Sequence, residues 1–182
     1  MAAISPLAVD ADRWQHARMV AIRKSNEEGH RRKFLVVVDE TPECDRAIVY
    51  AAKRAARTGG VVTLVFIIAP GDFQHWLGVE DIMRAEAQEE AEAALAKAAE
   101  RVRSVARTEP ETVVREGSKS EEIVELIEAD ADIAILILAA SSGTEGPGPL
   151  VSSIAGKTAG TFPIPVTIVP GNLDDDSIAA LA

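Results

Sequence analysis

The chain has 182 residues, 47% of them hydrophobic, so it is long and apolar enough to form one domain with a substantial core. Its formal net charge of -10 argues against general nucleic-acid binding, which needs clustered Lys and Arg side chains. Cys44 is the only cysteine and the three histidines lack metal-ligand spacing, which excludes an internal disulfide and argues against a metal site.

The sequence shows no sign of a membrane span or a secretory signal. No apolar run reaches the roughly 18 residues that a membrane-spanning helix needs. The first residues, MAAISPLAVDADRWQHARM, lack the basic start and apolar core of a signal peptide. We therefore expect a cytoplasmic protein. Arg31, Arg32 and Lys33 form one basic cluster, which we interpret as a solvated flank of the first strand.

The first predicted strand is KFLVVVD, residues 33–39, whose continuous apolar run is typical of a central parallel strand covered on both faces. A helix is predicted directly after it, with Thr41 as the N-cap and Pro42 in the first helical position. The apolar positions of this helix keep helical spacing until Gly59 and Gly60 end it.

Strands and helices continue to alternate in the middle of the chain. The next elements are a buried strand (61–68), a loop rich in aromatic residues (69–79), a long amphipathic helix (80–107) and a shorter strand (111–116). Ser118 and Glu121 then have the spacing of a capping box, which predicts the start of another helix.

Residues 133–138 and 165–169 are the last two predicted strands. Strands that alternate with helices predict an α/β fold in which a doubly wound, five-stranded parallel sheet is flanked by helices. Ligands of such sheets bind beyond the carboxyl ends of the strands, where the strand order reverses. We place this domain at residues 33–170, after a partly helical or flexible N-terminal extension (1–32) and before an acidic C-terminal tail (171–182) that is expected to fray.

The loop after the fourth strand does not match a P-loop. That pattern requires a glycine five residues before the glycine of Gly156-Lys157-Thr158, where this chain has Val151. A P-loop also lies directly between a strand and its helix, whereas Gly156 is well downstream of Leu138. We interpret Lys157 as an ordinary lysine on a helix surface.

Four segments together point to a known family. They are VVVDET at the end of the first strand, DRAIVYAAKRAA in the first helix, VREGSKSEEIVELIEADADIAILIL leading into the fourth strand, and PIPVTIVP at the last strand. In this order, from Lys33 to Val169, the chain resembles the universal stress proteins. The resemblance implies a Rossmann-like, adenine nucleotide α-hydrolase-like fold and a homodimer formed through the last strand, Val166 to Val169. An apolar edge strand left unpaired would favour aggregation, so this segment suits that role.

In nucleotide-binding members of this family, the fourth strand is followed by Gly, two residues, Gly, nine residues and then Gly-Ser or Gly-Thr. Glycine is used there because a side chain would keep the phosphates away from the backbone N–H groups. A literal register of this motif is found at Gly143, Gly146 and Gly156. It would extend the fourth strand to Ser142, shorten the last helix and put Lys157 where Ser or Thr is expected.

A second register keeps the family's distances to the fourth and fifth strands, and we prefer it because element lengths change less readily than loop residues. It replaces the three glycines by small residues, Ala139, Ser142 and Ser152, and puts Ser153 at the serine position. A helix that starts near Ser153 would still point its dipole at an anion. One carboxylate and two residues without an N–H group oppose phosphate binding: Glu145, Pro147 and Pro149.

The adenosine-binding half of the family's site is better preserved. Asp39 matches the aspartate that contacts the adenosine part of the nucleotide, and Thr41 matches the Ser or Thr two residues later. Ile67 and Ile68 are expected to form an apolar wall beside a purine, and Leu138 stands where the family often has methionine. Structural roles also explain these residues, since Asp39 and Thr41 can cap the first helix and the isoleucines can belong to the core.

Phe73, His75 and Trp76 form an aromatic cluster in the loop after the second strand. We interpret it as a plug that covers the core or packs under the long helix. The alternative is a lid on an apolar ligand pocket or part of a subunit contact. Trp14, in the N-terminal extension, either docks in the same region or is disordered.

These features favour a non-catalytic, universal stress protein-like binding or regulatory module in the stress response, with weak or no ATP binding and an unidentified protein partner. The alternative is a family member that binds ATP or AMP, with Mg²⁺, and acts as a nucleotide switch. A third hypothesis is an enzyme for activated acyl or sulfur substrates. It is disfavoured because Cys44, the one candidate thiol nucleophile, has acidic neighbours that oppose a low thiol pKa.

Overall fold

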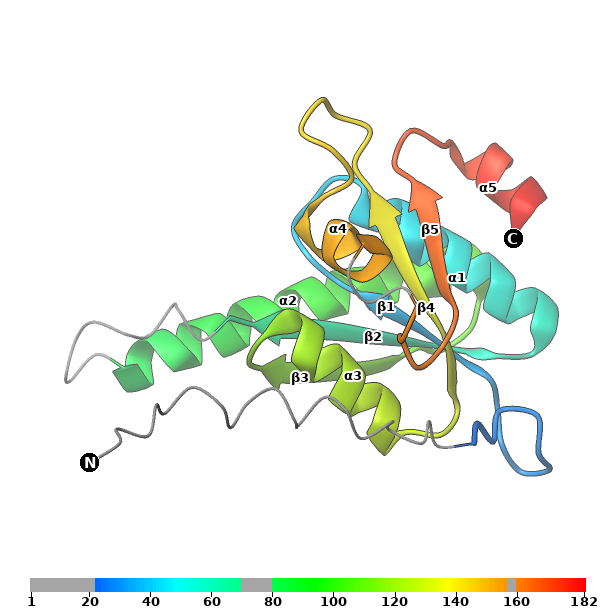
Figure 1. The fold of residues 1–182 in the computed structure, drawn as a ribbon, viewed down its shortest axis with the longest axis horizontal. Helices are drawn as coiled ribbons and strands as arrows, with labels where there is room; N and C mark the ends of the chain where they lie inside the picture. The colour runs from blue at the N-terminus through cyan, green and yellow to red at the C-terminus, as the bar shows by residue number, and fades with distance from the viewer. Residues whose placement is uncertain (1–21, 70–79, 157–159) are drawn as a thin grey trace, which may run out of the picture.

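The computed structural model describes residues 22–69, 80–156 and 160–182, which form a parallel sheet flanked by helices (Figure 1). The strands are β1 (Lys33–Val37), β2 (Val61–Ile68), β3 (Glu111–Glu116), β4 (Ile133–Ala140) and β5 (Val166–Pro170). The helices are α1 (Cys44–Thr58), α2 (Glu80–Ala106), α3 (Lys119–Ala129), α4 (Pro149–Gly156) and α5 (Asp175–Leu181). The strand order is β3-β2-β1-β4-β5 and every pairing is parallel, which confirms the predicted doubly wound α/β fold.

Both faces of the sheet are covered by apolar side chains. One face packs against α1, α2 and α5, around a core to which β1 contributes Phe34 and Val36. The other face packs against α3 and α4, which lie in front of the sheet in Figure 1, and there β1 contributes Leu35 and Val37. Successive residues of a strand point to opposite faces, so a strand buried on both sides must be apolar throughout. This explains the unbroken apolar runs of the sequence.

The start of α1 differs from the prediction, because Thr41 is not its N-cap. The helix begins at Cys44, and its capping residue, Glu43, makes no side-chain capping hydrogen bond. The carboxylate of Asp39 instead accepts hydrogen bonds from the backbone N–H and the hydroxyl of Thr41, which closes a turn before the helix. The predicted end is confirmed, since Gly59 follows Thr58 with a left-handed φ of 68°.

Two other helix starts differ from the sequence interpretation. Ser118 does precede α3, but it makes no side-chain capping hydrogen bond, so the predicted capping box is not formed. The helix α4 begins at Pro149 rather than near Ser153, which lies inside the helix. The first turn of α4 therefore consists of Pro149, Leu150 and Val151. These side chains have no hydroxyl group, whereas a helix that started near Ser153 would begin with serine hydroxyls.

The expectation that the acidic tail frays was wrong. Residues after β5 form α5, which packs on α1, and the side chain of Ile178 is fully buried. Asp174 caps the helix by accepting a hydrogen bond from the backbone N–H of Ser177. The carboxylate of Asp175 bridges two guanidinium groups, those of Arg46 on α1 and Arg101 on α2. Hydrogen bonding and charge from Arg101 lower the pKa of this carboxyl below its ordinary value.

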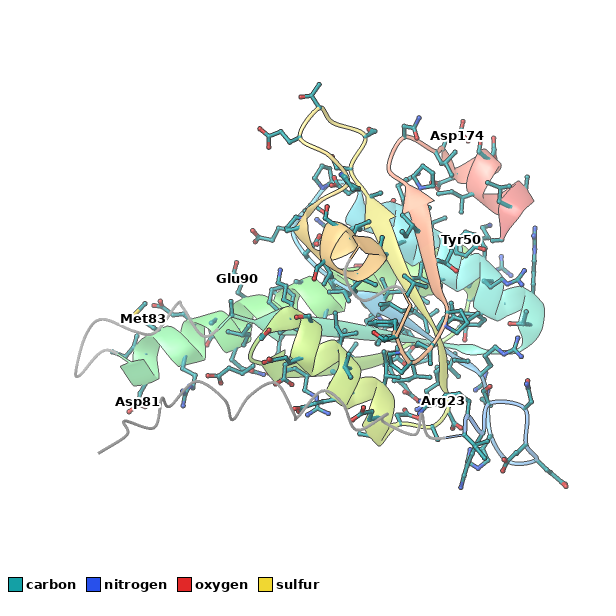
Figure 2. The ribbon with its side chains drawn as sticks, viewed as in Figure 1. Arg23, Tyr50, Asp81, Met83, Glu90 and Asp174 are labelled. Atoms are coloured by element: carbon teal, nitrogen blue, oxygen red, sulfur yellow. The ribbon has the colours of Figure 1, made fainter. Side chains whose placement is uncertain are left out.

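The basic cluster of Arg31, Arg32 and Lys33 makes more contacts than expected for the solvated flank that we inferred from the sequence. Lys33 forms ion pairs with Glu111 and Asp130, both 2.8 Å long, which join the amino ends of β1, β3 and β4. Arg31 donates hydrogen bonds to the carbonyl groups at the end of α1. Just upstream, Arg23 donates to carbonyl groups at the end of α3 (Figure 2). Residues 23–33 are therefore tied to the end of the sheet opposite the carboxyl ends of its strands.

Several predictions concern residues outside the described ranges. These are Trp14 in the N-terminal extension, the cluster of Phe73, His75 and Trp76, and Lys157. Within the described ranges, no helix combines the length and apolar character that crossing a bilayer requires. The same ranges hold no group of three or more His, Cys, Asp or Glu side chains arranged to hold a metal ion.

Candidate functional site

A crevice of about 780 Å³ lies at the carboxyl ends of β1, β2 and β4. The strand order explains its position. The chain passes from β1 outward to β3 and then returns across the sheet to β4, on the other side of β1. The connections after β1 and β4 therefore leave in opposite directions and open a gap between them, which is where open α/β sheets bind ligands. Its volume lies within the range typical of small-molecule sites.

Most of the predicted site residues come together in this crevice. Those that line it are Asp39, Thr41, Ile67, Ile68, Leu138, Ala139 and Ser153. Ser142 and Ser152 do not line it: Ser142 lies in the loop after β4, and Ser152 is exposed on α4. The ends of three strands thus bring together the adenosine half of the predicted site, whereas the phosphate half is only partly assembled.

The floor of the crevice is apolar and rigid. Ile67 and Ile68 at the end of β2 are 3% and 5% exposed, and Leu138 near the end of β4 is 4% exposed. Val37 and Val38 at the end of β1 complete this floor. Because these side chains belong to the packed core, their positions are fixed before any ligand arrives.

Asp39 stands at the edge of this floor with its carboxylate already oriented. Its Oδ1 atom accepts two hydrogen bonds from Thr41, at 3.0 Å from the backbone nitrogen and 2.5 Å from the hydroxyl. Among the described residues, none donates a hydrogen bond to Oδ2. A carboxylate can accept several hydrogen bonds on its two oxygens, so Asp39 keeps acceptor capacity for a ligand.

The rim of the crevice is acidic. Of the described residues that line it, Asp39, Glu40, Glu43 and Glu90 carry carboxylates and Lys119 carries a positive charge. Figure 2 shows Glu90 extending from α2 on the side of the molecule where α4 lies. The sequence analysis did not assign Glu43, Glu90 or Lys119 to the site. Glu90 comes from the middle of a helix whose charges look like an ordinary solvated face, and only the packing of α2 on β2 brings it there.

Comparisons with known proteins identify the family. The model of the universal stress protein family matches residues 30–170. The chain belongs to this family. Its fold is similar to that of the universal stress protein UspA from Lactobacillus plantarum (TM-score 0.61, 16% identity, covering 76% of this chain and 97% of that one). No match emerges among curated protein sequences.

Two further solved structures with the same fold contain a nucleotide. One is a universal stress protein in complex with cAMP (TM-score 0.54, 16% identity, covering 78% of this chain and 98% of that one). The other is a universal stress protein family protein from Arabidopsis thaliana with AMP bound (TM-score 0.51, 14% identity, covering 79% of this chain and 94% of that one). At these identities the similarity concerns the fold.

The loop that faces the phosphates in nucleotide-binding family members offers few N–H groups in this chain. Pro147 and Pro149 line the crevice and have none. The amide of Ser152 donates to the carbonyl of Gly148 at 3.0 Å, so it is engaged in the helix. The start of α4 therefore offers a ligand the amides of Gly148, Leu150 and Val151, which all line the crevice, one amide fewer than a helix start without proline.

The ends of β4 and α4 agree fully with neither register of the family's glycine motif. The strand ends at Ala140, whereas the literal register through Gly143 needs it to continue to Ser142. The helix starts at Pro149, earlier than either register implies, so the register with Ala139 and Ser142 at the first two glycine positions stays a prediction. Ala139 does line the crevice, whereas the loop carries Ser142 away from it.

Cys44 also lines the crevice, but its thiol is not activated. Burial raises the pKa of this thiol from 9.0 to about 11, and the carboxylates of Asp39, Asp45 and Glu43 add to the rise, while a backbone hydrogen bond at Asp39 opposes it. The sulfur lies 3.7 Å from the carbonyl oxygen of Val37, to which the thiol donates. At neutral pH the group is a buried, protonated thiol, which is a poor nucleophile.

The pKa of Cys44 predicts a loss of stability at alkaline pH. The unfolded chain releases this proton first, so the free energy of unfolding should fall as pH rises between about 9 and about 11, by ~2 kcal/mol from this group. Urea unfolding of the wild type and of Cys44→Ala across this range measures the effect. The variant should show a shallower decline, and parallel declines would contradict the assignment.

Proposed function

We propose that this member of the family is a non-catalytic binding and regulatory module of the stress response, located in the cytoplasm, that binds ATP weakly or not at all. The observation that carries the proposal is the crevice itself, in which an apolar floor and an oriented Asp39 face a rim with four carboxylates and one lysine. Such a site can accept a small organic ligand, but it gives little compensation for phosphate charge.

The balance of charges supports weak binding of a triphosphate. The starts of α3 and α4 both line the crevice, and each contributes the equivalent of roughly half a positive charge, worth about 0.3–1 kcal/mol to a nearby anion. Lys119 adds one cation, but it is exposed and therefore screened by salt. Salt also screens the exposed carboxylates of Glu40 and Glu90. The carboxylates of Asp39 and Glu43 are half-buried, so salt screens their repulsion of a phosphate less. The attraction that a triphosphate gains from the helix starts and Lys119 therefore at best nearly equals the repulsion from these carboxylates.

The residues that line the crevice also support a role without catalysis. Among the described residues that line it there is no histidine, and the thiol there, that of Cys44, has a raised pKa.

Calorimetric titration of ATP with Mg²⁺ into the purified protein tests this proposal. We expect a Kd of about 1 mM or weaker, equivalent to a binding free energy no more favourable than about -4 kcal/mol. A micromolar Kd would contradict the proposal, and if Asp39→Ala weakened it at least tenfold the nucleotide switch would be favoured instead.

The preserved floor is the observation that favours the alternative, an ATP- or AMP-binding switch. Asp39, Ile67 and Leu138 line the crevice, and AMP and cAMP complexes exist among proteins with this fold. AMP carries less negative charge than ATP, so on this alternative the crevice binds AMP more tightly than ATP. This alternative requires the amides of Leu150 and Val151 to hold the phosphate.

We also propose that two copies of the chain pair through Val166 to Val169. β5 is an edge strand of the sheet, and its Ile168 is 41% exposed, so pairing would cover an apolar side chain and an open row of backbone groups. Ile168→Asp should convert a dimer to a monomer in light scattering coupled to gel filtration. Thr112→Asp, on the opposite edge strand β3, is the matched control and should leave the dimer intact.

A further inference from the structure

The strand β3 is an open edge of the sheet among the described residues. It is the first strand in the order β3-β2-β1-β4-β5 and pairs on one side with β2. The amide of Gly117 donates to the carbonyl of Ile68 on β2, and the direction of the backbone groups alternates along a strand. Thr112, Val114 and Glu116 therefore direct their N–H and C=O groups away from β2, as an open row that can pair with another strand.

A carboxylate stands at each end of this edge. Glu111 begins β3 and Glu116 ends it, and their side chains are 46% and 42% exposed. The contacts of Glu111 with Lys33 and Thr63 use its Oε2 atom. The contact of Glu116 with Arg84 uses its Oε1 atom. The other oxygen of each carboxylate has no hydrogen-bond partner among the described residues, so a strand with two cations at the same spacing would match this edge.

A second copy of β3 is a poor match for the same edge. Symmetric antiparallel pairing over the whole strand would place Glu111 opposite the partner's Glu116, and the pair would occur twice. Like charges directly opposite each other destabilise a sheet. The edge therefore favours a strand that carries cations over a second copy of itself.

The N-terminal segment of this chain carries two cations at the required spacing. Arg13 and Arg18 are five positions apart, as are Glu111 and Glu116. In an antiparallel pairing that places Arg18 opposite Glu111, Arg13 lies opposite Glu116. Residues 13–18 then cover the full length of β3, with opposite charges facing each other at both ends.

The described residues next to this segment lie at the correct end of β3. Arg23 donates a hydrogen bond to the carbonyl of Asp130 at 3.1 Å. The ammonium group of Lys33 contacts the carboxylates of both Asp130 and Glu111, so the start of β3 is close to Asp130. The chain from Arg18 to Arg23 can span roughly 16 Å when extended, more than the roughly 10 Å across two strands of a sheet. Because the segment leaves from the amino end of β3, it lies along this edge antiparallel to β3.

We propose that residues 13–18 form a sixth strand that pairs antiparallel with residues 111–116 of β3. The ion pairs at the two ends fix the register, and the outward N–H and C=O groups of β3 gain partners. Trp14 lies opposite Arg115 in this register, and the guanidinium group stacks on the indole ring. The added strand covers one edge of the sheet and leaves β5 as the edge at which a second copy can pair.

Amide hydrogen exchange of the full chain, followed residue by residue by NMR, tests this proposal. The outward amides of Thr112, Val114 and Glu116 should exchange at least roughly tenfold more slowly than solvated amides. The amides of Val113 and Arg115 point toward β2 and are protected whether or not a strand is added, so they serve as the internal reference. Exchange of the outward amides at solvated rates, with the inward amides protected, would overturn the proposal.

Variants of the two arginines test the pairing of charges. Arg13→Glu combined with Arg18→Glu should raise the exchange rates of the outward amides roughly tenfold, because like charges then face each other at both ends. Lys53→Glu combined with Lys97→Glu makes the same change of charge on α1 and α2 and should leave these rates unchanged within about twofold. Protection that survives the arginine variant, or that the lysine variant removes equally well, contradicts the proposal.

A reversed pair of charges tests the register. Glu116→Arg alone should also release the amides of Thr112 and Val114. Combined with Arg13→Glu, it should slow their exchange at least roughly threefold relative to Glu116→Arg alone, because opposite charges face each other again. The loss of the contact with Arg84 is common to both variants and cancels in this comparison. If the combined variant shows no gain, or if protection in the wild type rises with protein concentration, as pairing with a second copy predicts, the proposal fails.

Discussion

Replacing Ile178 by alanine should lower the free energy of unfolding by about 2–4 kcal/mol. The side chain is fully buried between α5 and α1, in the same core as Phe34 and Val49, so the substitution leaves a cavity where packing is tight. Urea unfolding followed by circular dichroism measures the loss. If the substitution makes α5 detach from α1, the loss in the free energy of unfolding cannot exceed the free energy of docking this helix.

The control for this prediction lies in the same helix. Leu181 is 63% exposed, so Leu181→Ala removes a similar side chain without a cavity and should change the free energy of unfolding by less than about 0.5 kcal/mol. Limited proteolysis of both variants then shows whether α5 has detached in Ile178→Ala. Equal stability of the two variants would show that α5 is not part of the cooperative fold.

The elements of the sheet could be predicted because their sequences carry the signal locally. A strand covered on both faces must be apolar at every position, so Lys33–Val37, Val61–Ile68 and Ile133–Ala140 stand out as continuous runs. The stripe of α2 was also readable, since Ala91, Leu95 and Val102 follow helical spacing and are buried.

The docked C-terminal helix could not be predicted because its partners are distant in sequence. The side chain of Arg46 reaches Asp175, 129 positions away, and Arg101 reaches the same carboxylate from α2. Three consecutive aspartates look like a solvated tail when these guanidinium groups are unknown. Leu173 and Ile178 are the leucine and isoleucine that pack into the core, and two such residues around a run of aspartates are a weak signal.

The candidate site was half predictable for a similar reason. Asp39 and Ile67 lie at strand ends, and strand ends of a parallel sheet meet at one edge, so their convergence follows from topology. Glu90 reaches the crevice from α2, and its position depends on how that helix packs across β2. The start of α4 was misplaced because the loop residues before Pro149 give no periodic pattern.

Substituting alanine at Gly171 is expected to lower the free energy of unfolding by about 1–3 kcal/mol. A Cβ atom there would lie 2.8 Å from the carbonyl oxygen of Ala140 and 2.9 Å from the Cβ of Glu43, closer than real Cβ contacts allow. The amide of Gly171 also donates to that same carbonyl at 2.8 Å, so the backbone cannot retreat without losing this hydrogen bond. Thermal and urea unfolding measure the effect.

The matched control is Gly156→Ala, at the end of α4, where a new Cβ would meet no atom within 4 Å. Alanine favours a helix over glycine, so this variant should keep or raise the free energy of unfolding, by up to about 1 kcal/mol. Gly171 lies against Glu43 and Ala140, which adjoin the crevice, whereas Gly156 does not line it. An unchanged free energy of unfolding for Gly171→Ala would show that the end of β4 and the start of α1 can separate freely.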